Sequence, residues 1–253
     1  MCCFSQPVIS VSATNIFARA GTDGRQLLAY SMTVNADKEL AMVLPLPVKA
    51  ATDEPDVSFI DLSGYPDFFA DLRRGFPVPA SISSFGCSRS VPARSAAPLK
   101  VLSVGKFEAS FVPAMKDFSR LDERFRIADG AWNKLPQYHD YGFAVFKLRS
   151  GEVTVHPMAF SFPRRDARNL FFPTVHIHDG EVHPKADFDH VLYCQPREQE
   201  PLQVRDWRES PGNAGRFMKA DKAKGLIAPA QHCYQKTLHG LLPNRDTFIA
   251  VAT

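Results

Sequence analysis

The chain has 253 residues, of which 45% are hydrophobic and 23% charged, the proportions of an ordinary globular protein. Thirty basic and 27 acidic residues leave a net charge of +3, too small to argue for nucleic acid or an anionic membrane as a partner. No apolar run approaches the roughly 20 residues of a membrane-spanning helix, and the start of the chain lacks the order of a signal peptide. Five cysteines, an odd number, do not indicate a secreted disulfide framework. We therefore expect one globular domain over residues 1–253, in the cytoplasm.

Apolar or alternating runs predict strands in the first quarter of the chain. They are Pro7–Val11, Asn15–Ala20, Gln26–Val34, Glu39–Pro45 and Val57–Leu62. A short helix is expected from about Pro66 to Arg73, because a turn-like Ser-Gly-Tyr precedes it and Pro66 stands near the first helical position. Residues 77–98 are rich in serine, proline and alanine, a composition that predicts a mobile loop.

Two hairpins and a helix are expected in the middle of the chain. The hairpins would join Lys100–Val104 to Phe107–Val112 and Gly142–Leu148 to Val153–Phe162. Apolar residues at helical spacing between them predict a helix over Ala114–Arg124. Pro157 interrupts the last of these strands and indicates an edge strand or a bulge.

The end of the chain adds two expected strands, His190–Gln195 and Thr247–Ala252, and a basic amphipathic helix over Gly215–Lys224. Strands outnumber helices, and they are not separated by the long helices that connect the strands of a parallel sheet. The predicted fold class is therefore α+β, rich in β-structure, with mainly antiparallel strands and a few short helices.

The stretch from Phe171 to Cys194 holds four of the eight histidines. Asp179-Gly180 within it is a strong signal for a two-residue hairpin turn, in which both central residues have positive φ. Such a turn places alternate residues of the two strands on one face of the hairpin. The residues predicted to share that face are His176, His178, Glu181 and His183.

Three neutral imidazoles and one carboxylate on a rigid hairpin suit a divalent metal ion such as Zn, Fe or Mn. Three protein ligands leave an open coordination position, which a catalytic metal needs. His190 is close enough in sequence to be a further ligand, and Glu181 is a fourth ligand or a general base. The alternative is a solvated face, because an antiparallel hairpin with one face on the core presents polar residues on the other.

The order of these residues, H-x-H followed by Glu181 and His183, resembles the metal motif of cupin barrels. In cupins two strand histidines, a glutamate and a later histidine bind one metal ion. The resemblance implies a metal site with this ligand set. Cupins place the glutamate further from the histidine pair, so the resemblance concerns the ligands and not membership of the family.

Cys2 is a second candidate for chemistry. If Met1 is removed, Cys2 carries a free amine beside its thiol, and an amine with a pKa near 8 can take the thiol's proton. This is the logic of hydrolases with an N-terminal nucleophile, which begin on a β-strand, as residues 2–11 are expected to do. The alternatives are a soft metal ligand or a cysteine without chemical function.

Two further resemblances concern the start of the chain. IFARAGTD, residues 16–23, resembles the F-G-R-N-x-D stretch of the bile salt hydrolase and penicillin V acylase family, with one additional residue between arginine and aspartate. That resemblance implies positioning roles for Arg19 and Asp23 beside a Cys2 nucleophile. CCFSQPV and MVLPLPV, residues 2–8 and 42–48, resemble an uncharacterised bacterial family that begins near a cysteine, and this resemblance implies no activity.

Three hypotheses for the function follow. The first is an enzyme that uses a divalent metal at the histidine hairpin and acts on a small-molecule substrate. The second is an N-terminal cysteine hydrolase of C–N bonds, with Cys2, Arg19 and Asp23 as its site. The third is a non-catalytic binding or scaffold protein. The sequence has no phosphate loop, dinucleotide-binding glycine motif, G-x-S-x-G or H-E-x-x-H.

Overall fold

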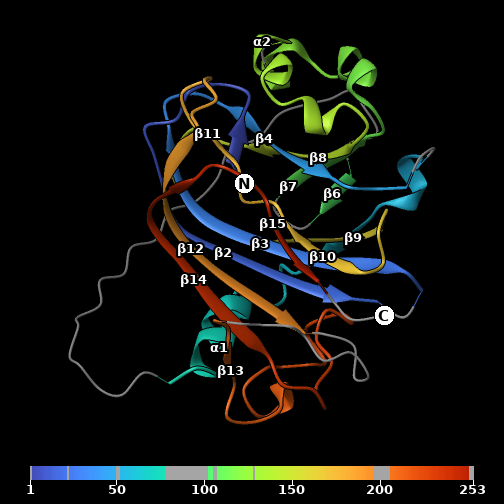
Figure 1. Cartoon of the computed structure of the whole chain (residues 1–253), viewed down its shortest axis with the longest axis vertical. Coiled ribbons are helices and arrows are strands. Elements are labelled where there is room, and N and C mark those ends of the chain that lie inside the picture. The colour runs from blue at the N-terminus through green and yellow to red at the C-terminus, as the bar shows by residue number, and fades with distance from the viewer. Residues whose placement is uncertain are drawn as a thin grey trace.

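The computed structural model describes residues 2–21, 23–49, 52–77, 102–104, 107–127, 129–195 and 206–250. Two large β-sheets and one small one make up most of this part of the chain (Figure 1). The six-stranded sheet has the order β11 (His176–Ile177), β1 (Cys2–Phe4), β4 (Leu40–Leu46), β8 (Gly142–Leu148), β7 (Phe107–Val112) and β6 (Leu102–Val104). The seven-stranded sheet has the order β13 (Arg208–Glu209), β14 (Tyr234–Pro243), β12 (Lys185–Gln195), β2 (Ser10–Ala20), β3 (Arg25–Ala36), β9 (Gly151–Pro163) and β5 (Ser58–Asp61). A two-stranded sheet pairs β10 (Asn169–Phe172) with β15 (Thr247–Ala250).

Helices are short and few in the described chain. The α-helices are α1 (Phe68–Arg74) and α2 (Asp129–Asn133). The 3-10 helices are η1 (Glu54–Asp56), η2 (Met115–Arg120), η3 (Glu123–Phe125), η4 (Pro136–Tyr138) and η5 (Ala214–Arg216). The helix predicted near Pro66 is confirmed as α1.

The predicted α+β class with mainly antiparallel strands is wrong. The fold is β-rich, and both large sheets are mixed: β1 pairs with β11 in parallel, and β12 pairs with β2 in parallel. Both parallel pairs join segments far apart in sequence. The alternation of polar and apolar residues in a strand shows which of its faces is buried, but not whether the adjacent strand runs parallel or antiparallel. The sequence pattern therefore did not reveal these pairs.

Two predicted helices are also wrong. Ala114–Arg124 forms the 3-10 helices η2 and part of η3, and Gly215–Lys224 contains only the end of η5 followed by turns. In the first of these, Met115, Phe118 and Leu121 recur every three residues. A period of three fits the three residues per turn of a 3-10 helix at least as well as an α-helix.

The predicted hairpins have different outcomes. β6 and β7 pair antiparallel as expected. β8 and β9 do not pair with each other, because β8 lies between β4 and β7 while β9 lies between β3 and β5 in the other sheet. The interruption at Pro157 is confirmed as a bulge, since the register with β3 shifts between Met158 and Val155. The loop predicted at 77–98 lies outside the described residues from 78 onward.

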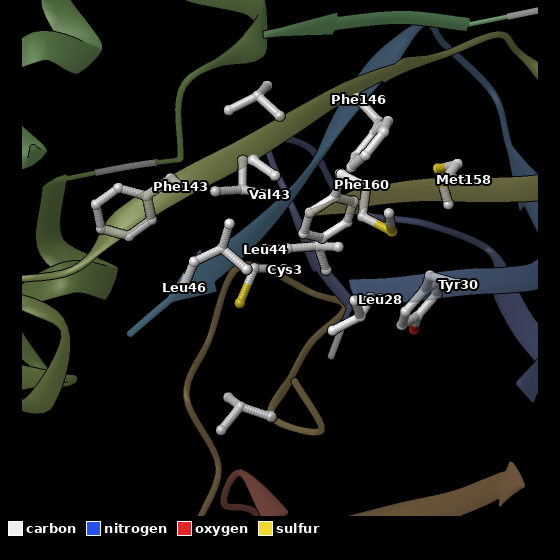
Figure 2. Packing of buried hydrophobic residues seen from close by; sticks show 14 of the residues in the cluster. Cys3, Leu28, Tyr30, Val43, Leu44, Leu46, Phe143, Phe146, Met158 and Phe160 are labelled. Carbon is white, nitrogen blue, oxygen red and sulfur yellow. The ribbon is translucent and has the colours of Figure 1, made fainter. Parts of the chain in front are cut away.

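The main core fills the space between the two large sheets. Phe146 of β8 meets Phe160 of β9 there (Figure 2). Phe143, three residues earlier on β8, belongs to the same cluster but packs against Phe118 and Trp132 on the other face of the six-stranded sheet. Phe146 and Phe160 are in ring contact, with centroids 5.8 Å apart. Removing such side chains from water is the principal stabilising term of a layered β-fold.

A second core lies on the opposite face of the seven-stranded sheet. Phe17 and Tyr193 point to this face and pack with Phe68 and Leu72 of α1. The neighbours of Phe17 on β2, Ile16 and Ala18, belong to the main core instead. This strict alternation makes the seven-stranded sheet the middle layer of the molecule.

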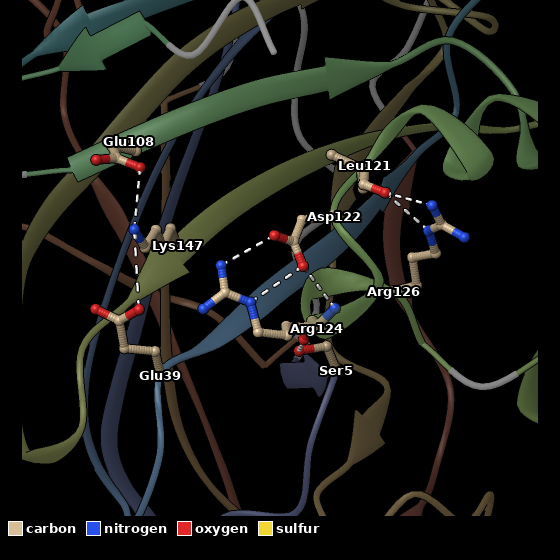
Figure 3. A network of polar contacts seen from close by, with 8 residues as sticks. All are labelled: Ser5, Glu39, Glu108, Leu121, Asp122, Arg124, Arg126 and Lys147. Carbon is tan, nitrogen blue, oxygen red and sulfur yellow. Dashed lines mark hydrogen bonds and ion pairs between the residues drawn. The ribbon is translucent and has the colours of Figure 1, made fainter. Parts of the chain in front are cut away.

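Polar contacts fasten the outer side of the six-stranded sheet (Figure 3). Lys147 on β8 lies between Glu108 and Glu39, with its Nζ 3.4 and 3.9 Å from their carboxylates. Ser5, just after β1, donates its hydroxyl to the carbonyl of Arg124 and accepts from the backbone N–H of Ala41, both at 2.9 Å. These hydrogen bonds hold the start of the chain beside β4.

Candidate functional site

The candidate site is a buried corner where β11 meets β1 and β12, and we name it the histidine corner: His176, His178 and His190 with Phe188. β11 is only two residues long and pairs in parallel with β1, placing Cys2 opposite His176 and Cys3 opposite Ile177. The N-terminal stretch is held again further on, where the N–H of Val8 donates to the carbonyl of His178 at 3.0 Å.

The side chain of Asn244 takes the place of a neighbouring strand on the other side of β11. Its Oδ1 accepts from the backbone N–H of His176 at 2.7 Å. Its Nδ2 donates to the carbonyls of His176 and His183, each at 2.9 Å. One amide side chain therefore satisfies both backbone groups of His176.

Asp246 anchors the approach to β11. Its Oδ1 accepts from the backbone N–H groups of Thr174 and Val175 at 2.8 and 3.1 Å, and its Oδ2 accepts from the hydroxyl of Tyr138 at 2.5 Å. Burial raises the pKa of the Asp246 carboxyl, and the hydrogen bonds that it accepts oppose this shift. The segment 174–176 is thus held mainly by side chains of residues 244–246, which follow β14 directly.

The imidazole of His176 contacts the other two imidazoles of the corner. Nε2 of His176 lies 3.2 Å from Nε2 of His190, so one ring donates and the other accepts. The rings of His176 and His178 are stacked, with centroids 4.8 Å apart. Phe188 covers His176 at a centroid distance of 4.4 Å.

Burial holds all three imidazoles in the neutral form. It lowers the pKa of His176 to about 2 and that of His178 to about 4. The pKa of His190, which has no exposed surface, is lowered well below its usual value for the same reason. Nδ1 of His190 and Nε2 of His178 are buried without a hydrogen-bond partner among the described residues.

The hairpin predicted at Asp179-Gly180 is wrong. Gly180 has a φ of +84°, but Asp179 is not among the residues with positive φ, as the predicted turn requires. No strand pairs with β11 from residues 181–183, which are irregular. Pairing with β1 and with the Asn244 side chain replaces the hairpin.

The four residues expected on one face therefore separate. His176 and His178 point into the corner, whereas Glu181 and His183 are exposed. Glu181 forms an ion pair with Lys134, and Nε2 of His183 lies 2.8 Å from the carboxylate of Asp179. His190, expected only as a helper, takes the position beside His176.

The described residues contain no group of three or more His, Cys, Asp or Glu side chains placed to hold a metal ion. His176 and His190 bring two imidazole nitrogens together, and His178 adds a stacked ring. The contact between His176 and His190 is a hydrogen bond between two neutral imidazoles. An imidazole can take up a proton near neutral pH, and burial opposes that protonation here.

Of the residues expected around a cysteine nucleophile, Cys2 and Arg19 lie on strands of different sheets, and Asp23 lies in the turn between β2 and β3. Cys2 lies on β1 of the six-stranded sheet, and its side chain is outside the described part of the structure. Arg19, at the end of β2, donates to the carbonyls of Leu226 and Gly225, and burial lowers the pKa of its guanidinium. Asp23 accepts from the backbone N–H of Arg25 at 3.1 Å.

Sequence reasoning missed the residues that build the corner around the histidines. Phe188 lies two residues before His190 on β12, so the two side chains share one face of the strand. This spacing was a signal in the sequence that Phe188 points inward with His190. Asn244 and Asp246 follow β14, a strand that the sequence did not predict. Their roles depend on contacts some 70 residues apart, for which the sequence contains no local signal.

A small hollow in the described part, of about 20 Å³, has Glu54, Asp117 and Arg120 among its lining residues. That volume admits about one water molecule. No described helix is long and apolar enough to cross a membrane.

Comparison with known proteins shows a likeness of fold. No family model matches the chain. The crystal structure of baculovirus P35 is similar with a TM-score of 0.51 and 13% identity, over 96% of this chain and 97% of that one. A mutated baculovirus P35 after caspase cleavage has a TM-score of 0.48 and 14% identity, over 96% and 99% of the two chains. P35 in the caspase-8/P35 complex has a TM-score of 0.46 and 12% identity, over 96% and 97%.

Proposed function

We propose that this chain is a non-catalytic protein that binds a protease, and that it acts in the cytoplasm. The observation that carries the proposal is the likeness of its fold to baculovirus P35 along nearly the whole length of both chains. P35 has been solved in complex with caspase-8 and after cleavage by a caspase. The third hypothesis from the sequence, a binding protein, thereby becomes the first.

The surface and the thiols are compatible with this role. Three large hydrophobic side chains are exposed on the described surface, Ile9, Leu241 and Phe248, and Leu241 is the most exposed at 67%. Single exposed apolar side chains are normal on protein surfaces, so these three are positions to test by substitution and not an argument for the role. The thiols of Cys194 and Cys233, which are buried and form no disulfide, suit a reducing compartment. The metal-enzyme and cysteine-hydrolase hypotheses stay predictions.

The test is inhibition and cleavage measured together. The purified chain is mixed with caspase-8 and, separately, with a protease that cuts after arginine. The second protease is included because the predicted loop at residues 77–98, where a protease could cut, contains Arg89 and Arg94 and no acidic residue. We expect the folded chain to lower the activity of one of these proteases at near-stoichiometric concentration. Intact-mass analysis of the chain then shows whether and where it is cut.

The heat-unfolded chain is the control, because an unfolded chain is a substrate rather than a folded ligand. Leu241→Asp, against Leu241→Ala, tests whether apolar contact through β14 contributes. If both proteases remain fully active at a large excess of folded chain, and no complex is seen by size-exclusion chromatography, the proposal fails. Inhibition that survives unfolding contradicts it as well.

A further inference from the structure

We propose that two copies of this chain associate through the outer edge of β14. Residues 237–242 of one copy would pair antiparallel with the same residues of the other, about a twofold axis at Gly240. The inference does not depend on the proposed protease binding. It rests on three features of this edge: unpaired backbone groups, a run without charge or proline, and a register that brings no like charges together.

The outer side of β14 is open over most of its length. On its inner side, β14 pairs with β12 along the whole strand from Tyr234 to Pro243. On its outer side, β13 pairs only with Tyr234 and Gln235. No other strand of the described chain pairs with β14, so from Lys236 onward it forms the border of the seven-stranded sheet (Figure 1).

The backbone groups that face outward are fixed by contacts at both ends of β14. Just before the strand, the carbonyl of Cys233 accepts from the N–H of Ser210, on the side of β13, at 2.8 Å. Just after it, the N–H of Asn244 donates to the carbonyl of Pro184, on the side of β12, at 3.0 Å. Successive residues of a strand direct these groups to opposite sides, so the odd-numbered residues face outward. The outward groups without a partner among the described residues are those of Thr237, His239 and Leu241.

This edge lacks the features that usually prevent sheet edges from pairing. Edge strands in proteins are commonly short, charged, interrupted by proline or covered. The strands β5, β6 and β11 at other sheet ends have only four, three and two residues, and the side chain of Asn244 covers β11. Residues 237–242 of β14 instead read Thr-Leu-His-Gly-Leu-Leu, without a lysine, an arginine, an acidic residue or a proline.

The side chains of this run leave apolar surface at the border. Leu238 packs on the main core but is only half-buried, as Leu242 is. Leu241, on the other face, is 67% exposed. Gly240 has a φ of +82°, and in the described part no heavy atom beyond its chain neighbours lies within 4 Å of the position that a Cβ would take. A second backbone can therefore approach β14 at Gly240 and cover these leucines.

A second copy fits this edge because the run is self-complementary about Gly240. His239 would lie opposite Leu241 of the second copy, and their outward N–H and carbonyl groups would bond to each other. Leu238 would lie opposite Leu242 of the second copy, which extends the main core across the axis. Lys236, the nearest charged residue, would lie opposite Asn244, so no like charges oppose each other.

The neighbouring positions for the axis fit less well. An axis at His239 would place Pro243 of the second copy against Gln235, whose outer side β13 already occupies. An axis at Leu241 would pair His239 with Pro243, which has no N–H to donate. Gly240 is therefore the centre that uses the open edge and avoids β13.

Light scattering after size-exclusion chromatography of the full chain, without any protease, tests the association. Between about 1 and 100 µM we expect the mass to rise from that of one chain, 28.2 kDa, toward twice that value. His239→Pro removes an outward N–H that bonds to nothing else in the described chain, so the fold should persist. Because the loss occurs in both copies, the dimer should weaken at least about thirtyfold.

His239→Thr is the matched control, because it changes the side chain, keeps the N–H and suits a strand. Its dimer should stay within about threefold of the wild type. Circular dichroism shows whether each variant is folded.

Paired charges test the register and do not depend on the proline variant. The double variant His239→Lys with Leu241→Lys opposes like charges across the axis, as does the double variant His239→Glu with Leu241→Glu. Each should dimerise at least about tenfold more weakly than the wild type. Mixing the two should give a mixed dimer, seen by native mass spectrometry, at least about tenfold tighter than either variant forms with itself.

A wild-type chain that stays monomeric at about 100 µM overturns the proposal, even if another protein or peptide binds the edge. A dimer that folded His239→Pro forms as well as the wild type overturns it too, because that dimer uses another surface. So does a mixture of the two charge variants that forms no mixed dimer.

Discussion

The layer between the two large sheets and the histidine corner are both buried, yet different interactions hold them. In the layer, apolar side chains such as Phe146 and Phe160 pack from long strands with many backbone hydrogen bonds. In the corner, imidazoles lie against one another, and a two-residue strand depends on Asn244 and Asp246 side chains. Phe146 and Phe160 are buried in the layer, as His176 and His190 are in the corner, where His178 is half-buried.

The comparison shows that burial alone does not determine how a region responds to its surroundings. Apolar packing has no titratable group, so its contribution to stability does not change with pH. The corner is stable only while its imidazoles are neutral, since their pKa values are lowered by burial. In the unfolded chain these imidazoles bind protons below about pH 6.5, whereas in the folded corner they stay neutral to a lower pH. The contribution of the corner to stability is therefore lost as the pH falls below about 6.5.

Breaking the apolar layer should have the largest effect. Phe160→Ala removes a ring with no exposed surface that contacts Phe146, Phe59 and Phe162. We expect a loss of about 3–5 kcal/mol in the free energy of unfolding, because the cavity adds to the lost transfer energy. Denaturant unfolding at pH 7 measures it.

Phe248→Ala is the matched control, since this ring is 50% exposed, and we expect it to cost about 1 kcal/mol or less. Equal losses for the two variants would show that the layer is not the principal source of stability.

Removing one amide from the corner should have an intermediate effect. Asn244→Ala leaves the backbone N–H and carbonyl of His176 without their partner. We expect a loss of about 2 kcal/mol, with faster hydrogen exchange at 174–178 than in β3. Asn213→Ala, an exposed asparagine that makes no capping hydrogen bond, should stay within about 0.5 kcal/mol of the wild type. An Asn244 variant as stable as the Asn213 variant would mean that the chain around β11 is held by other contacts.

The smallest effect is expected at Glu181, at the exposed rim of the corner. Its carboxylate pairs with Lys134, and both side chains are more than half exposed. Surface ion pairs of this kind contribute about 0–1 kcal/mol, so Glu181→Ala should change the free energy of unfolding by no more than about 0.5 kcal/mol. Thermal unfolding of Glu181→Ala and Glu181→Gln side by side measures it. A loss above about 1 kcal/mol would show that Glu181 contributes more than a surface ion pair does.

The sequence by itself determined most of the strands and their inward faces. The alternation in Gln26–Val34 and the apolar run in Glu39–Pro45 predict β3 and β4, because a strand's period of two is a local property. The proline bulge in β9 and the short helix α1 are local as well. The histidine-rich stretch was also correctly singled out as unusual, although its geometry was not.

Only the tertiary structure decided what the histidines do. Whether His176 faces His183 across a turn or His190 across a sheet depends on which strand pairs with β11, and that partner is β1, more than 170 residues away in the chain. The free energy of such long-range pairing comes from burying whole faces of sheets, not from the few residues of the turn. The sequence therefore has a strong local signal for a hairpin at Asp179-Gly180, but this hairpin does not form. The preceding strand β11 instead brings His176 into a buried pair of imidazoles, held by Asn244 and Asp246.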